Sequence, residues 1–401
     1  MKNIIKSILF AAGAVMLMAS CSDWTDTEIQ NPADLTVNGR SEAYYAQLRN
    51  YKKSDHPVVF GWFGGWSGRD ASLEKSLAGL PDSVDFVSLW GNFSNLTQAQ
   101  KEDLEYVQRV KGTKVLICWQ VHDIGDQLTP DVPAGWAEKN PGKNWRHEFW
   151  GWGSTREEKI AATEKYAKAI LDTINKYNYD GFDIDAEYGL PQIGFTPNEE
   201  LWRNDGCMDK FIETLAKELG PHSGTAKMLV VDGKPEDIPT KYADYFDYFI
   251  LQAYDSDAHL ASPSDTQRRF DRQLNYWKSV LTPEQLARKI IITCNFENGN
   301  NITAYSYIMA TGAENQHLYD GVLPEKFMIW QGKDDSGRVR NRWLARVSAA
   351  FALFNPVFDG QTYRKGGMGT YHMEYEYKAD GTINTYPNLR MAIQIMNPTN
   401  K

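Results

Sequence analysis

Three acidic side chains, Asp183, Asp185 and Glu187, occupy alternate positions in the stretch Tyr179–Glu187. Successive side chains of a β-strand point to opposite faces, so a strand here places all three carboxylates on one face. Clustered carboxylates repel one another and resist desolvation, which makes such a strand unfavourable unless the acids are used. A solvated edge strand or a metal site would also explain acids, but the flanks offer no histidine or further acids for a metal. We therefore interpret the three acids as a catalytic group and expect no metal.

The composition narrows the class of protein. The 401 residues are 42% hydrophobic and 24% charged, as in globular proteins. A net charge of −9 and the lack of a long basic run argue against nucleic acid as a partner. The four cysteines show neither zinc spacing nor a disulfide framework, and we expect no cofactor. The 13 tryptophans and 21 tyrosines suit either a carbohydrate-binding protein or a large core.

Residues 1–20 resemble a signal peptide, because two lysines precede an apolar stretch that is too short to span a membrane comfortably. The stretch ends Met-Ala-Ser before Cys21, which is similar to a bacterial lipobox. An ordinary secretory signal with an incidental cysteine is the alternative. The acidic residues after Cys21 resemble the export signal of Bacteroidetes surface lipoproteins. We expect a lipid on Cys21, a tether and lead-in over residues 21–50, and attachment to the outer membrane at the cell surface.

From residue 51 onward, apolar runs alternate with helical patterns. The expected strands are Pro57–Trp62, Val84–Trp90, Lys114–Gln120, Tyr179–Glu187, Lys227–Asp232, Phe246–Tyr254, Lys289–Phe296 and Gly366–Met373. The expected helices are Gln98–Val110, Thr155–Lys176, Cys207–Leu219, Thr266–Val280 and Arg338–Phe354. Eight such units predict an α/β fold, a closed (β/α)8 TIM barrel that forms a single catalytic domain over residues 51–401. Active sites of these barrels lie at the carboxyl ends of the strands, where the fourth strand places its acids.

The stretch Asp180–Glu187 resembles the DxxDxDxE signature of glycoside hydrolase family 18, which contains chitinases and endo-β-N-acetylglucosaminidases. The resemblance implies a substrate-assisted reaction, in which the 2-acetamido group of the sugar attacks its own anomeric carbon. It implies that Glu187 is the general acid and base, that Asp185 holds the acetamido N–H, and that Asp183 shares a proton with Asp185. Asp180 begins the motif outside the strand alternation; it is grouped with the substrate-binding residues, although its position favours a structural role.

The sixth and eighth strands distinguish between branches of this family. Gln252 and Tyr254 share one strand face, and the resemblance implies that Tyr254 hydrogen-bonds the acetamido carbonyl. Chitinases commonly have methionine where this chain has Gln252, and tryptophan in the eighth strand, where the nearest candidate here is Tyr371. Both departures resemble the endo-β-N-acetylglucosaminidase branch, so Gln252 and Tyr371 are expected to bind substrate.

Four further residues are assigned by position alone. Trp66 follows the first strand and either stacks on a sugar or covers the barrel mouth, whereas Trp90 is expected in the core. Asn295 and Glu297 end the seventh strand and are expected to touch substrate. The long third loop, residues 121–154, carries four tryptophans that form either a glycan platform or a small satellite core.

The sequence thus predicts a monomeric endo-β-N-acetylglucosaminidase that acts on N-glycans or glycoproteins. It would cut the β-1,4 bond of the N,N'-diacetylchitobiose core with retention of configuration. The alternatives are a chitinase of the same family and a barrel that binds glycans without cutting them. The acid Glu187 is present, which speaks against the non-catalytic alternative.

Overall fold

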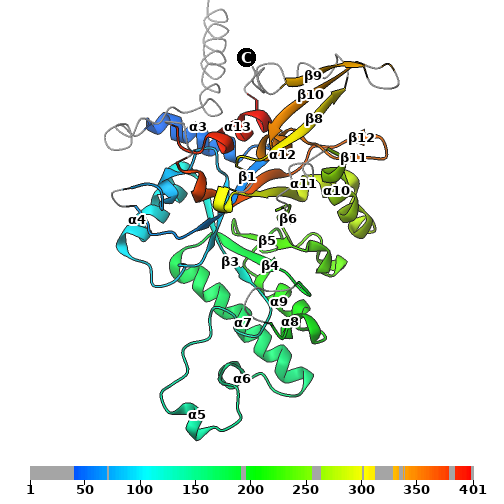
Figure 1. Cartoon of the computed structure of the whole chain (residues 1–401). Helices are drawn as coiled ribbons and strands as arrows, with labels where there is room; N and C mark the ends of the chain where they lie inside the picture. The colour runs from blue at the N-terminus through cyan, green and yellow to red at the C-terminus, as the bar shows by residue number, and fades with distance from the viewer. Residues whose placement is uncertain are drawn as a thin grey trace, which may run out of the picture.

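Eight parallel strands form a closed barrel in the computed structural model, which describes residues 40–69, 72–190, 196–254, 263–299, 302–311, 328–333, 337, 339–378 and 384–398 (Figure 1). The strands are β1 (Val58–Gly64), β2 (Phe86–Trp90), β3 (Lys114–Gln120), β4 (Gly181–Ala186), β5 (Met228–Gly233), β6 (Tyr248–Gln252), β7 (Ile290–Asn295) and β13 (Gly367–Tyr371). Each lies within a residue or two of a predicted strand, so the predicted (β/α)8 barrel is confirmed. The signal peptide and Cys21 lie outside the described residues.

Helices surround the barrel (Figure 1). They are α3 (Glu42–Lys52), α4 (Gln98–Tyr106), α5 (Trp136–Lys139), α6 (Trp145–Trp150), α7 (Arg156–Tyr177), α8 (Glu200–Arg203), α9 (Cys207–Leu215), α10 (Pro263–Trp277), α11 (Pro283–Lys289), α12 (Val347–Leu353) and α13 (Pro387–Met396). Capping boxes at Thr97, Thr155 and Thr282 begin α4, α7 and α11, where each threonine accepts a bond from an otherwise unsatisfied backbone N–H. No helix in the described ranges is both long and apolar enough to cross a membrane.

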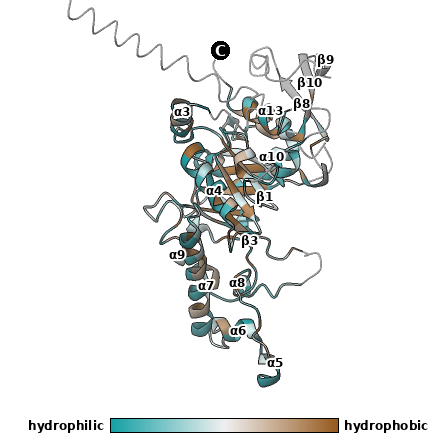
Figure 2. Cartoon of the chain, turned by 90° about the vertical axis from the view of Figure 1, so that its left-hand side faces the viewer, coloured by the Kyte–Doolittle hydropathy of each residue, from teal (hydrophilic) through white to brown (hydrophobic). Residues whose placement is uncertain are grey.

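Strand alternation produces two hydrophobic layers. Side chains such as Phe60, Leu116 and Ile250 fill the inside of the barrel, while Phe182 and Ile184 belong to the larger layer between the strands and the helices. Hydrophobic residues accordingly concentrate in the barrel strands (Figure 2). The outer face of β4 is therefore apolar, as predicted, and its acids are left for the interior.

The prediction of a helix over residues 338–354 is wrong for its first half. Val339–Arg346 is strand β10, which pairs antiparallel with β8 (Tyr305–Thr311) and β9 (Met328–Lys333), and only α12 is helical. Antiparallel pairing among three segments within residues 305–346 supplies the hydrogen bonds of this sheet, and strand preference depends on such pairing more than on the segment itself.

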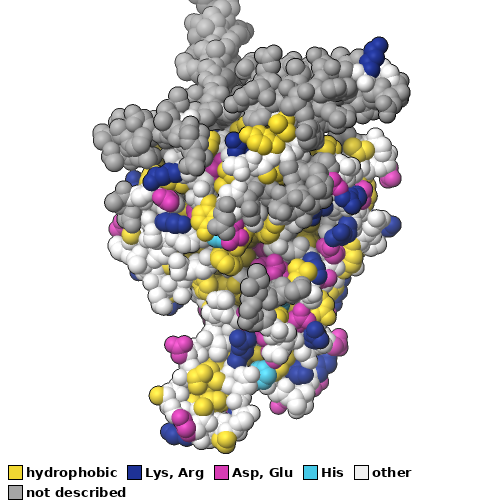
Figure 3. All heavy atoms as spheres, in the orientation of Figure 1, with side chains coloured by type: hydrophobic (Ala, Val, Ile, Leu, Met, Phe, Trp, Pro, Cys, Tyr) yellow, Lys and Arg dark blue, Asp and Glu magenta, His cyan; other side chains and the backbone are white. Residues whose placement is uncertain are grey.

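The long loop after β3 folds into an arm that carries α5 and α6 away from the barrel (Figures 1 and 2). Its aromatic rings contact one another, with centroids 5.4 Å apart for Trp136 and Trp145 and 5.6 Å apart for Trp145 and Phe149. Trp150 is buried against Tyr166 of α7. Hydrophobic and charged side chains are mixed on the surface of this arm (Figure 3). Of the two alternatives for the tryptophans of this loop, a glycan platform or a small satellite core, the satellite core therefore applies at least to the buried base of the arm.

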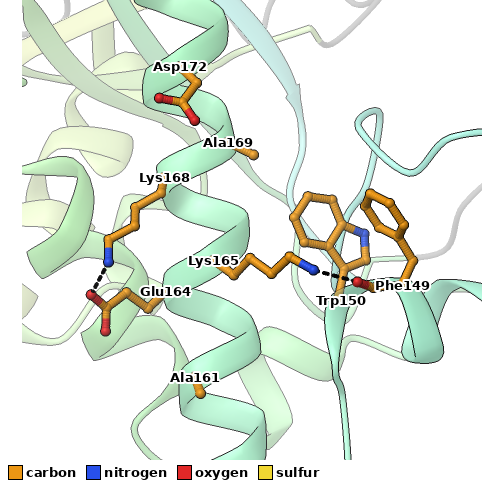
Figure 4. A pocket seen from close by; sticks show the side chains of 8 residues that line it. All are labelled: Phe149, Trp150, Ala161, Glu164, Lys165, Lys168, Ala169 and Asp172. Carbon is orange, nitrogen blue, oxygen red and sulfur yellow. Dashed lines mark hydrogen bonds and ion pairs between the residues drawn. The ribbon is translucent and has the colours of Figure 1, made fainter.

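A shallow pocket lies between the arm and the outer face of α7 (Figure 4). Lys165 of α7 donates a hydrogen bond to the carbonyl of Phe149 at 2.5 Å, and its ammonium lies over the rings of Phe149 and Trp150. These contacts hold the arm to α7. The lining residues come from α6 and α7, and none of the acids of β4 takes part.

Candidate active site

The acids of β4 lie where the interior of the barrel opens. Asp183 is fully buried, Asp185 is 7% exposed, and Glu187 follows the end of the strand and is partly exposed. Parallel register places Gln120 of β3 and Asp232 of β5 on either side of Asp185. Residues in register on parallel strands point to the same side, so these three polar side chains face the interior at one level.

Asp183 is held by two donors from neighbouring strands. Its Oδ2 accepts a hydrogen bond from Ser88 Oγ at 2.7 Å and from Trp62 Nε1 at 3.1 Å. Burial raises the pKa of Asp183 to about 6, while these hydrogen bonds lower it. Asp183 is therefore the member of the buried group whose environment best supports a negative charge.

Asp232 is a functional candidate that sequence reasoning missed. It is fully buried at the end of β5, where its Oδ1 accepts a hydrogen bond from Gln252 Nε2 at 2.7 Å. Burial and the neighbouring carboxylates raise the pKa values of Asp185 and Asp232 well above the usual range. The barrel thus holds three neighbouring buried carboxyl groups that cannot all be ionised near neutral pH. The sequence signal that could have identified Asp232 is its position as an acidic residue at the end of the predicted strand Lys227–Asp232.

Cys118 of β3 borders the same group. Its Sγ lies 3.7 Å from Asp232 Oδ2, and Sγ and one oxygen from each of Asp183 and Asp232 all lie within 4.8 Å of one another. One thiolate and two carboxylates at this spacing could surround a cation. Burial and the nearby acids, however, raise the pKa of the Cys118 thiol well above its usual range, which favours a neutral thiol. Protons shared among the acids explain the arrangement without a metal.

Glu187 is oriented by Gln120, a second residue that sequence reasoning missed. Gln120 Nε2 donates a hydrogen bond to Glu187 Oε2 at 2.6 Å. The charge of Glu187 contributes to the raised pKa of Asp185, so the two carboxylates interact directly. A partly exposed acid such as Glu187 can exchange protons with a bound substrate, while the buried acid beside it, Asp185, remains shielded from water.

Aromatic side chains form one wall of the opening. The rings of Tyr254 and Tyr371 stack with centroids 5.2 Å apart, and Trp62 meets both rings edge-on at 6.1 and 6.2 Å. Burial, Asp232 and Asp185 raise the pKa of Tyr254 well above the usual range, so its hydroxyl remains a hydrogen-bond donor. The structure thereby brings the predicted residues Tyr254, Tyr371 and Gln252 together beside the acids.

Asn295 and Glu297 lie at the same mouth. Asn295 ends β7 in register with Tyr371 of β13, and its Oδ1 accepts the backbone N–H of Glu297 at 2.6 Å. The charge of Glu297 contributes to a raised pKa of Tyr371. Both residues are near the aromatic wall, although Asn295 is only 8% exposed.

Of the two roles considered for Trp66, contact with a sugar is wrong. Trp66 is 1% exposed and belongs to the layer outside the barrel, where its Nε1 donates to Asp103 Oδ2 at 2.8 Å. Trp90 shows the opposite error, because it was expected in the core but is 46% exposed. Its ring meets those of Tyr371 and His372 edge-on at 6.1 and 5.8 Å, which places it beside the aromatic wall.

Asp180 does not lie with the other motif acids. It precedes β4 at the amino end of the barrel, where its Oδ2 accepts hydrogen bonds from Gln108 Nε2 at 2.7 Å and from the backbone N–H of Val115 at 2.8 Å. Its grouping with substrate-binding residues is therefore wrong, and its role is to join β3 and β4. A Cβ on the next residue, Gly181, would lie 2.1 Å from the carbonyl oxygen of Met228, so β5 requires glycine there.

The fold and the acids together define a glycoside hydrolase, and the chain belongs to glycoside hydrolase family 18. It matches the family described as glycoside hydrolase family 18, BT1044-like, over residues 21–317 and 330–395. The solved structure of a Glu-to-Gln variant of BT1044 with selenomethionine is 32% identical. It covers 92% of this chain and 97% of its own, with a TM-score of 0.64.

A more distant structure shares the fold. The apo endo-β-N-acetylglucosaminidase from Cordyceps militaris is 19% identical, covers 90% of this chain and 98% of its own, and has a TM-score of 0.54. No curated protein matches the sequence.

Proposed function

We propose that this chain is an endo-β-N-acetylglucosaminidase that cleaves the β-1,4 bond in the N,N'-diacetylchitobiose core of N-glycans with retention of configuration. The observation that carries this proposal is the wall beside the acids. There Gln252 is bonded to Asp232, and Tyr371 stacks on Tyr254 in place of the tryptophan that chitinases usually carry. The Cordyceps militaris enzyme of the same fold carries this activity in its name, and a variant of it was solved with fucosyl-N-acetylglucosamine-Asn.

In the proposed reaction, Glu187 donates its proton to the glycosidic oxygen while the acetamido oxygen of the same sugar attacks the anomeric carbon. The bond to the leaving sugar breaks, and an oxazolinium forms. Asp185 accepts a hydrogen bond from the acetamido N–H and stabilises the positive charge, and the Tyr254 hydroxyl donates to the acetamido oxygen. Water then attacks the anomeric carbon as Glu187 takes a proton back, and two inversions give retention.

We further propose that the enzyme is anchored to the outer membrane through a lipid on Cys21, facing the outside of the cell. The support is the Met-Ala-Ser-Cys ending of the apolar N-terminal stretch and the acidic residues that follow it. Metabolic labelling with a fatty acid tests this proposal. Label on the wild type and none on Cys21→Ala is the expected result, and equal labelling of both would contradict it.

A mass-spectrometric digest tests the activity. A chain lacking the first 21 residues is incubated with a high-mannose glycoprotein, a complex-type glycoprotein and chitin oligomers, beside Glu187→Gln and the exposed surface variant Glu148→Gln as a matched control. We expect released glycans that leave one N-acetylglucosamine on asparagine, and a loss of about 10²–10⁴-fold in Glu187→Gln alone, because an amide cannot donate the proton. Cleavage of chitin oligomers alone would identify a chitinase, and binding without cleavage would identify a glycan-binding barrel.

A further inference from the structure

Asp232 lies outside the motif of β4, yet it faces both buried aspartates of that motif. It ends β5 directly in register with Asp185, and one of its carboxyl oxygens lies within 4.8 Å of a carboxyl oxygen of Asp183. A hydrogen bond between two carboxyl groups requires a proton on one of them. The question is which of the three aspartates carries it.

The hydrogen-bond partners of Asp183 indicate that it acts as an acceptor. Its Oδ2 already accepts bonds from Ser88 and Trp62, whereas its Oδ1 accepts none from a nitrogen or oxygen donor within the described ranges. Asp185 Oδ1 is likewise buried without such a donor in the part of the chain that the structure describes. Two buried carboxylate oxygens therefore need a donor, because a buried acceptor left unsatisfied is unfavourable.

Asp232 has the complementary arrangement. Gln252 Nε2 donates to its Oδ1, and the carbonyl oxygen of a neutral acid can accept such a bond as a carboxylate oxygen does. The proton then belongs on Oδ2, the oxygen that also lies 3.7 Å from Cys118 Sγ. The groups that act most strongly on Asp232 are Asp185 and Asp183. Both are acids, and their charge favours retention of this proton.

We propose that Asp232 is a positioning residue that stays protonated at neutral pH and shares its proton with the inner oxygens of Asp183 and Asp185. This inference deepens the proposed function and rests on it. The hydrogen bond from Asp232 favours the ionised form of Asp185, which accepts the acetamido N–H more strongly than a neutral acid and supplies the negative charge that stabilises an oxazolinium. Burial and the two neighbouring acids raise the pKa of Asp232 well above its usual range, in agreement with this role.

Three variants test the role. Asp232→Asn keeps an N–H donor at nearly the same place, Asp232→Ala removes it, and Val230→Ala is a matched control on the same inward face of β5. With the substrate that the wild type cleaves, we expect Asp232→Ala to lower kcat about 10–100-fold, the effect of one hydrogen bond to a charged group. We expect its acidic pH limb to move to higher pH, because Asp185 is then protonated more easily.

Asp232→Asn, the variant that keeps a hydrogen-bond donor, separates a positioning role of Asp232 from a packing role. We expect Asp232→Asn to recover kcat to within about tenfold of the wild type and to restore the acidic limb, since the amide still donates. Val230→Ala should lower the melting temperature while keeping kcat and the pH profile. If Asp232→Asn were as impaired as Asp232→Ala, the carboxyl would act as an ion or only as packing, and the proposal would be overturned. Unchanged kcat in Asp232→Ala would overturn it as well.

A second measurement needs no substrate and so separates this proposal from the proposed function. Aspartate 13Cγ resonances of the labelled protein are recorded from pH 4 to pH 8 in the wild type and in Asp232→Asn. We expect one carboxyl that remains protonated at pH 7 in the wild type and is missing in the variant. Full ionisation of every aspartate at pH 7 would overturn the proposal, even if the enzyme cleaved N-glycans as proposed.

Discussion

Substitution of Trp66 by phenylalanine separates its structural contact from a role in sugar binding. The change keeps an aromatic ring but removes the indole N–H that reaches Asp103 Oδ2 at 2.8 Å. Asp103 is fully buried and also accepts hydrogen bonds from Ser76 Oγ and from the backbone N–H groups of Leu77 and Ala78. One carboxylate therefore fixes the segment that follows β1 through four donors.

The expected loss of free energy of unfolding in Trp66→Phe follows from these contacts. A hydrogen bond to a charged group contributes about 1.5–3 kcal/mol. The smaller phenylalanine ring leaves a void in a fully buried site, which costs roughly a further 1 kcal/mol. We expect Trp66→Phe to lower the free energy of unfolding by about 2.5–4 kcal/mol. Because Trp66 lies outside the barrel interior, KM for glycan should stay at the wild-type value.

Urea unfolding of the wild type, Trp66→Phe, Asp103→Ala and the double variant measures the effect, with m unchanged across the set. The coupling free energy between the two residues should be about 1.5–3 kcal/mol. A loss of stability below about 0.5 kcal/mol, together with a raised KM, would refute this reasoning, because uncoupled surface sites fall in that range. Trp66 would then have to face the substrate.

Three further changes test other parts of the structure. Asp185→Asn should slow cleavage of natural glycan yet still use a preformed sugar oxazoline, which bypasses the assisted step; normal turnover of natural glycan would contradict the role of Asp185. Trp90→Ala should raise KM about tenfold, since loss of one aromatic contact is worth about 1.4 kcal/mol, and calorimetry with glycan should show the same change in affinity. Glu376 accepts the backbone N–H groups of Asn388 and Leu389, and burial raises its pKa to about 7. Its contribution to stability is therefore present below about pH 4.5 and lost as the pH rises through 7, so Glu376→Gln should flatten the pH dependence of unfolding by about 2–3 kcal/mol between pH 5 and pH 8. Parallel curves for variant and wild type would contradict that assignment.

The sequence by itself determined the barrel and the acids of β4. The eight strands are short apolar runs separated by helical patterns, and the alternation of Asp183, Asp185 and Glu187 is a property of neighbouring residues. Strand and helix periods act over a few residues, so a single sequence displays them. The outward packing of Phe182 and Ile184 follows from the same period.

Only the tertiary structure decided what surrounds those acids. Asp232 and Gln120 join Asp185 because the barrel places β5 and β3 beside β4 in one register, and register between strands is set by hydrogen bonds across the sheet. Trp66 lies beyond the end of β1 and turns into the outer layer, whereas Trp90 is the last residue of β2 and is exposed. Beyond the end of a strand the alternation of faces no longer determines where a side chain points, so for Trp66 a contact with Asp103, far away in the chain, determines the direction.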